Sequence, residues 1–427
     1  MRKVVLYSLL LVGGLAVAQF LPTDNPGLHW TIRVLTMVAL SFIMIHVGYE
    51  FELDKSRPRQ YGWDYFVAFT AAAFPWVFCT LYFVFVMSPS TLWGEGELWK
   101  EMLLQARFAS PTSAGVLFAM LAAAGLAATW VFRKARILAI FDDLDTILLM
   151  IPLKMAMVGF RWQLAVVVLV IVMLLWMAWR YLHRLRAPTT WPWVIGYSVA
   201  IAASSEVIYI LSKAIDQTVP LHLEVLLPAF VLGAMLARPV NHDVHRNDAL
   251  ADHEHGPASA GEQRVSTIVS SVFMVLVGLS MPAIRGPQDG AMAAEVGTQA
   301  SAASSLVASN TSFPGWDWIA IHVLAITVLS NLGKMFPAFV YRREAHWRQR
   351  LAVAIGMWPR GEVGAGVLVI SISYGIGGPV LTVAALSLAV NLLLTGVFIL
   401  IVKRLLLAVP EPDAISVATA PAPPAVP

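Results

Sequence analysis

The chain has 427 residues, of which 58% are hydrophobic and only 13% charged, and its mean hydropathy is +0.72. This composition excludes an ordinary soluble globular protein. The formal net charge of +3 is small, and we expect no nucleic-acid partner. The single cysteine, Cys79, excludes an internal disulfide.

About twelve apolar runs are long enough to cross a bilayer as helices, which requires roughly 20 residues each. The first run follows Met1-Arg2-Lys3, and we interpret it as a span because no small-residue cleavage site precedes Leu21. The sequence therefore predicts an all-α membrane protein. The runs lie near 4–21, 30–52, 64–87, 101–125, 135–159, 162–181, 191–213, 222–239, 265–284, 316–341, 350–373 and 379–402.

Basic residues cluster at both termini and at the even-numbered connections, whereas the odd connections carry acids and only scattered bases. By the positive-inside rule, both termini are cytoplasmic and the number of spans is even. We expect one transmembrane domain at 1–409, followed by a disordered cytoplasmic tail at 410–427 that is rich in Ala, Pro and Val. The cytoplasmic loop that contains His242, His245, His253 and His255 is a candidate pH sensor or metal site, or simply a solvated loop.

The run from 135 to 160 contains three carboxylates, Asp142, Asp143 and Asp145, in its cytoplasmic third. A charged Asp near the centre of a bilayer costs roughly 2.5–3.5 kcal/mol on the translocon scale. Three of them in one span are not expected to serve stability. An intramembrane acidic cluster of this kind predicts an ion or proton site.

Two other spans contain helix-breaking residues. The fourth reads FASPTSAGVLFAM around Pro111, and the eleventh reads GMWPRGEVGAGVL around Pro359. Pro removes a backbone donor and Gly loosens the helical hydrogen bonds, so both helices are expected to be discontinuous. The two spans run in opposite directions, as an inverted repeat of spans 3–5 and 10–12 requires.

The tenth span supplies a counter-charge, Lys334. Counted from the nearest cytoplasmic basic residue, Lys334 lies about 12 Å deep, Asp142 about 9 Å and Pro359 about 13 Å, at about 1.5 Å per residue. An acid cluster, an amine and a helix break are thus expected at similar depth. A Lys–Asp pair is the natural arrangement for two buried charges.

Several segments in order resemble the monovalent cation/proton antiporter superfamily, from about the second span to the twelfth. They are GYEFELD (48–54), ASPTSAGVL (109–117), FDD (141–143), LEVLLPAFVLGAML (223–236), VFMVLVGLSM (272–281), Lys334 and PRGEV (359–363). The Asp-Asp form is similar to the electrogenic branch of that superfamily. The resemblance implies inverted repeats with two crossed discontinuous helices, and a homodimer.

The resemblance also implies roles for individual residues. Asp143 would bind the cation and protons, Asp142 would pair with Lys334, and Ser110 and Thr112 would lie beside the site. The chain departs from the family pattern at two positions.

At the first, Pro111 stands where an Asp is common in part of the family. At the second, Asp145 is an extra acid, which we assign a supporting role as a ligand, a proton relay or a hydrogen-bonded structural acid. Arg360 and Glu362 would support the crossed-helix assembly, as a structural pair.

These features predict a secondary antiporter, not an enzyme, in a bacterial-type inner membrane, with no cofactor besides the transported ions. Na⁺ is favoured over K⁺ because no C-terminal nucleotide-binding domain follows the membrane part. Two alternatives from other classes remain. An intramembrane prenyltransferase could use DDLD (142–145) to hold Mg²⁺-diphosphate but would need a second Asp-rich motif. An ion channel would need no amine fixed to the acid.

Overall fold

The computed structural model describes residues 2–20, 26–49, 51, 58–158, 162–215, 225–237, 260–280, 315–373, 376 and 378–408. Within these ranges the regular structure is helical, apart from one isolated bridge between Leu185 and Leu236. The expected all-α membrane fold is therefore confirmed. The histidine loop and the tail at 410–427 lie outside the described residues.

Each predicted apolar run corresponds to one helix or to a pair of helices. The first half of the chain forms α1 (Arg2–Ala18), α2 (Pro26–Tyr49), α3 (Pro58–Tyr82), α4 (Gly96–Ala106), α5 (Ala114–Ala123), α6 (Trp130–Val158) and α7 (Trp162–Arg180). The second half forms α8 (Trp191–Ile215), α9 (Leu226–Met235), α10 (Ala260–Leu279), α12 (Trp316–Gly333), α13 (Phe336–Phe339), α14 (Trp347–Gly356), α15 (Glu362–Ser373) and α16 (Pro379–Leu407).

Six of the described helical segments are long and apolar enough to cross a membrane, by length and composition. They are Trp30–Tyr49, Arg59–Met87, Trp191–Ala214, Gly261–Leu279, Trp316–Phe339 and Pro379–Leu407. Shorter apolar helices lie at Lys3–Ala18, Ala165–Arg180 and Leu226–Met235. The fourth and eleventh predicted spans are each divided into two shorter helices, for the reason given below.

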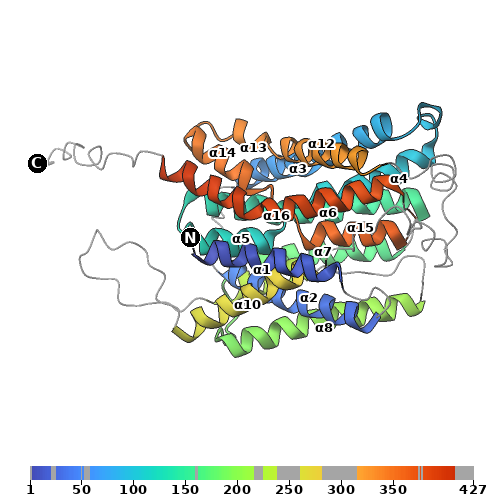
Figure 1. Ribbon diagram of the computed structural model, residues 1–427. Helices are drawn as coiled ribbons and strands as arrows, with labels where there is room; N and C mark the ends of the chain where they lie inside the picture. The colour runs from blue at the N-terminus through green and yellow to red at the C-terminus, as the bar shows by residue number, and fades with distance from the viewer. Residues whose placement is uncertain are drawn as a thin grey trace, which may run out of the picture.

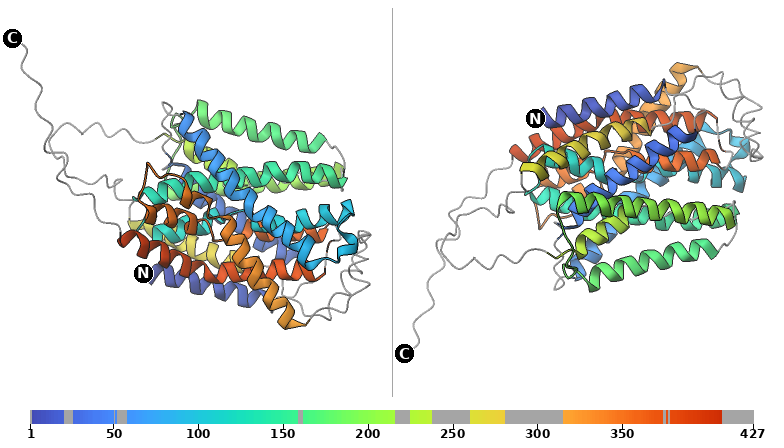
Figure 2. Two further views of the ribbon diagram at one scale, coloured as in Figure 1. Left: turned by 90° about the horizontal axis from the view of Figure 1, so that it is seen from above. Right: turned by 90° about the horizontal axis from the view of Figure 1, so that it is seen from below.

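The helices form one elongated bundle with two groups (Figure 1). The first group consists of α1, α2 and α7 to α10, in which α2 packs on α8 and α9, and α1 on α10. The second group consists of α3 to α6 and α12 to α16, in which α12 packs on α3 and α16. Figure 2 shows the green helix α7 at one edge and the orange α12 at the opposite edge. The start of α1 and the end of α16 lie at the same end of the bundle (Figure 1).

Two helix crossings in the first group depend on glycine. Gly48 of α2 and Gly233 of α9 face each other's helix so closely that a Cβ on either would overlap a backbone carbonyl of the partner. Gly14 of α1 and Gly278 of α10 form the same kind of contact. Small residues allow such close approach in membranes, where helices associate by direct packing rather than by exclusion of water.

Both predicted helix breaks are present. After α4, a tight turn at Arg107–Ala109 leads into a non-helical segment at 110–113, and α5 begins at Ala114. In the eleventh span, α14 ends at Gly356, and α15 begins at Glu362 after a second non-helical segment. Pro111 and Pro359 lie in these two segments, where the missing N–H prevents a continuous helix.

The close contact between Gly14 and Gly278 leads to a testable prediction, and the preceding residue, Gly13, provides its control. Gly14→Ala is expected to lower the thermal unfolding temperature of the detergent-purified protein, because overpacking costs about 1–3 kcal/mol. Gly13→Ala, whose added Cβ would meet nothing within 4 Å, is expected to leave it unchanged or to raise it. Equal unfolding temperatures for the two variants would contradict the assigned crossing.

Candidate ion and proton site

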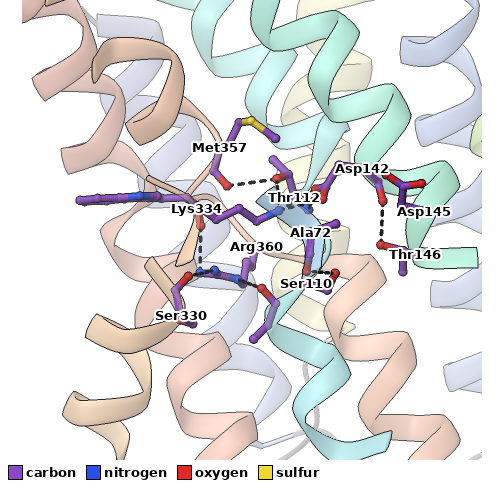
Figure 3. Close-up of polar contacts among 12 residues, drawn as sticks. Ala72, Ser110, Thr112, Asp142, Asp145, Thr146, Ser330, Lys334, Met357 and Arg360 are labelled. Carbon is purple, nitrogen blue, oxygen red and sulfur yellow. Dashed lines mark hydrogen bonds and ion pairs between the residues drawn. The ribbon is translucent and has the colours of Figure 1, made fainter. Parts of the chain in front are cut away.

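The two helix breaks meet each other inside the bundle (Figure 3). The Thr112 hydroxyl donates to the carbonyl of Met357 at 3.0 Å, and the backbone N–H of Ser113 donates to the carbonyl of Pro359 at 2.9 Å. Each break thereby satisfies backbone groups that the other leaves without a helical partner. This contact creates a polar centre in an apolar bundle.

Asp142 of α6 and Lys334 form an ion pair at this centre. The Lys334 ammonium lies 2.9 and 2.8 Å from the two carboxylate oxygens of Asp142, and both side chains are fully buried. The backbone N–H of Thr112 donates to the same carboxylate at 2.7 Å, and the Thr112 hydroxyl accepts from Lys334 at 3.1 Å. The first break, the acid helix and the amine are therefore in direct contact.

The position of Lys334 follows from the end of α12. The helix ends at Gly333, where a Cβ would overlap Pro75 of α3, and Lys334 is the next residue. A cation is favoured there because the carbonyls at a helix C-terminus carry about half a negative charge. The helix end and the Asp142 carboxylate both compensate for moving the ammonium out of water.

The other two acids lie on the same helix, one and three residues after Asp142. Asp143 is 5% exposed, projects about 100° around the helix from Asp142 and acts electrostatically on Lys334. Asp145 is 1% exposed, and neither of its carboxylate oxygens accepts a hydrogen bond of ordinary geometry from any residue that the structure describes. Nearby, the Thr146 hydroxyl donates to the backbone carbonyl of Asp142 at 2.9 Å.

Ser110 belongs to the same break, but its hydrogen bonds run away from the ion pair. Its hydroxyl donates to the carbonyl of Ala72 in α3 at 2.7 Å and accepts from Arg107 at 2.8 Å. Of the two predicted hydroxyl residues, Thr112 therefore contacts the Asp142–Lys334 pair, whereas Ser110 joins the break to α3.

Arg360 is fully buried and connects both breaks to α12. Its guanidinium donates to the carbonyls of Ala109 and Ser330, both at 2.9 Å, and to the side-chain oxygen of Asn331 at 2.6 Å. Two of these acceptors are carbonyls near helix C-termini, where a positive charge is stabilising. Glu362, the predicted partner of Arg360, begins α15, and its side chain lies outside the described part of the structure.

Sequence reasoning missed a polar ladder between α12 and α16. Asn331 donates to Asn391 at 2.9 Å, and Thr327 and Ser387 share a hydrogen bond at 2.9 Å. The only signal in the sequence is that each of these polar residues interrupts an apolar run. The ladder links Arg360, through Asn331, to the last helix.

A second missed cluster joins three elements near the Lys/Arg-rich end of α6. Lys134 of α6 lies 3.1 Å from Asp64 of α3 and 3.0 Å from Glu344 in the α13–α14 connection. The Tyr341 hydroxyl donates to Asp64 at 2.7 Å. Lys134 belongs to the basic cluster at the connection before the fifth predicted span, which the positive-inside rule assigns to a cytoplasmic loop, whereas its side chain is only 5% exposed.

The contacts of Lys134 lead to a prediction for a variant that lacks its positive charge. Lys134→Met is expected to destabilise the protein by about 3–5 kcal/mol, because Asp64 is left buried without a cation, and adding Asp64→Asn should restore much of the loss. Lys100→Met removes an exposed pair with Glu97 and should have little effect. Thermal unfolding in detergent measures all of them, and an equal effect of Lys134→Met and Lys100→Met would contradict the assignment.

Two comparisons with known proteins bear on the family to which the chain belongs. No curated protein matches the chain closely enough to count as a relative. The family model described as "Sodium/hydrogen exchanger, transmembrane" matches residues 3–408, which is nearly the whole chain. The chain therefore belongs to the sodium/hydrogen exchanger family, whose members are membrane transporters that exchange cations for protons.

Proposed function

We propose that the protein is a secondary antiporter that exchanges Na⁺ for protons by alternating access. The observation that carries this proposal is the buried Asp142–Lys334 pair at the contact of two broken helices. The pair places a carboxylate, an ammonium and freed backbone groups within reach of one ion. Discontinuous helices use such groups to bind substrates at mid-membrane.

The proposed exchange depends on competition for carboxylate oxygens. Asp143 is the cation-binding acid, and Asp142 is held by Lys334 when no cation is present. A cation that arrives between the two acids attracts the Asp142 oxygens away from Lys334 and so weakens the ion pair. Burial of a carboxylate also favours its protonated form, so protons and cations compete for the same group.

The proposed charge movement follows from this competition. A buried ammonium that loses its carboxylate partner is strongly disfavoured and releases its proton. Each monovalent cation is then exchanged for one proton, which balances its charge, and for the additional proton that Lys334 releases. Exchange is therefore electrogenic in this account, with more protons moved than cations.

The proposed conformational change uses the two helix groups. The second group contains both breaks and all three acids of α6. Its main contacts with the first group are those of α1 with α5 and α16 and of α2 with α5. The second group would move against the first and expose the site to each side in turn. We also propose a homodimer, on the resemblance to the antiporter superfamily.

The proposed location is a bacterial-type inner membrane with both termini in the cytoplasm. Support comes from the Lys/Arg clusters at the even-numbered connections, and from the start of α1 and the end of α16, which lie at the same end of the bundle. K⁺ is the alternative cargo, because hard oxygen ligands serve both ions. The prenyltransferase and the channel are less favoured, because Lys334 forms an ion pair with Asp142, whose carboxylate either function would need to keep unpaired.

The proposal is tested with the purified protein in vesicles under an imposed pH gradient. Proton-coupled flux is measured with Na⁺, Li⁺ and K⁺ in turn, and Na⁺ is expected to support it. Asp143→Ala should reduce flux by at least about tenfold, because one buried ligand charge is lost. Asp317→Ala, at an exposed position in the first turn of α12, is the matched control and should retain flux.

Two outcomes would contradict the proposal. Unchanged flux in Asp143→Ala would remove the cation-binding role from that residue. Cation flux that does not depend on protons would indicate a channel instead of an exchanger.

A further inference from the structure

The proposed exchange leaves one buried charge without a role, the guanidinium of Arg107. Arg107 is fully buried at the end of α4, four residues before Pro111. It donates to the Ser110 hydroxyl at 2.8 Å and to the backbone carbonyl of Asp145 at 3.0 Å, and it lies over the Trp76 ring at 4.8 Å. These contacts bind the first break to the acid helix, but none of them neutralises its charge.

The nearest unexplained acid is Asp145. Its buried carboxylate accepts no hydrogen bond of ordinary geometry from the described residues, although the Tyr65 hydroxyl approaches it. An ionised carboxylate that is buried without compensation is unstable. The charge of Arg107 acts on Asp142 and, less strongly, on Asp145, and both Arg107 and Lys334 act on Asp145.

Three acidic and three basic side chains around the site act on one another electrostatically. Asp142, Asp143 and Asp145 are opposed by Arg107, Lys334 and Arg360, and each of these six side chains is at most 5% exposed. Lys334 contacts Asp142 directly. Arg360 donates to carbonyls near two helix C-termini, which together carry about one negative charge. Arg107 remains, and of these three bases it is the one that contacts Asp145, at the backbone carbonyl.

We infer that Arg107 is the fixed counter-charge of Asp145 and a positioning residue for the proposed exchange site. Because a guanidinium stays protonated, it offsets Asp145 in every state of the cycle. A helix with three acids thus presents a monovalent cation with the charge of a two-acid site. This inference rests on the proposed function, since it concerns how strongly that site attracts the cation.

The inference predicts opposite effects for the two halves of the pair. Arg107→Gln leaves an uncompensated negative charge, so the apparent KM for the cation should fall about tenfold, and maximal exchange should slow because release is slower. Asp145→Asn leaves an uncompensated positive charge, so the KM should rise about tenfold. The double variant Arg107→Gln/Asp145→Asn restores the balance and should return the KM to within about threefold of wild type.

The test measures cation-dependent exchange in vesicles and, separately, the Na⁺ concentration that half-stabilises the detergent-purified protein against heat. Arg107→Lys keeps the charge and should lie closer to wild type than Arg107→Gln. Arg360→Gln is the matched control, because it also removes a fully buried guanidinium that donates to backbone carbonyls. Electrostatic partners of Arg360 include Asp142 but not Asp145, so Asp145→Asn should not rescue it.

The outcomes separate the inference from the proposed function. If wild type exchanges cations but Asp145→Asn fails to rescue Arg107→Gln in both measurements, Arg107 is only a structural tie and the inference is wrong. If Asp145→Asn rescues Arg107→Gln and Arg360→Gln equally, the pairing is also wrong. If wild type neither exchanges nor is stabilised by Na⁺, Li⁺ or K⁺, the proposed function fails and the inference fails with it.

Discussion

The contact between Lys334 and Asp142 is the interaction on which the rest of the site depends. Two full charges 2.8 Å apart and without exposure to solvent are stable only together, because either one alone would be a buried, uncompensated ion. Their stability also needs the Thr112 N–H, which the first helix break supplies. The ion pair therefore explains why the fourth span is broken at that depth.

The surrounding structure stabilises the buried charges of the ion pair and still allows a cation to replace its contacts. Arg360 fixes the two breaks and the end of α12 through backbone carbonyls, so these elements hold their positions without using the acids. Lys334, by contrast, is held mainly by a carboxylate and one hydroxyl, which a cation could replace with its own contacts. A rigid frame around an exchangeable pair is the arrangement that ion-coupled transport requires.

The sequence was sufficient for the helices, the two breaks and the depth of the amine. Charges and prolines are rare in apolar runs, and helical rise converts their spacing into depth. Apart from the Asp142–Lys334 pair, the lateral neighbours of the polar residues were not predictable. Ser110 bonds to Ala72 instead of facing the ion pair, and Lys134 is buried against Asp64 instead of lying in the loop. Such contacts depend on which helices are adjacent and on side-chain direction, which periodicity does not determine.

The charge moved in each cycle tests the central claim most directly. In vesicles clamped at known membrane potentials and pH gradients, the potential at which cation flux reverses gives the number of protons exchanged for each cation. If Lys334 releases its proton when a cation displaces it from Asp142, more than one proton moves per cation and the reversal point shifts with potential. Exchange with a ratio of one, indifferent to membrane potential, would contradict the account.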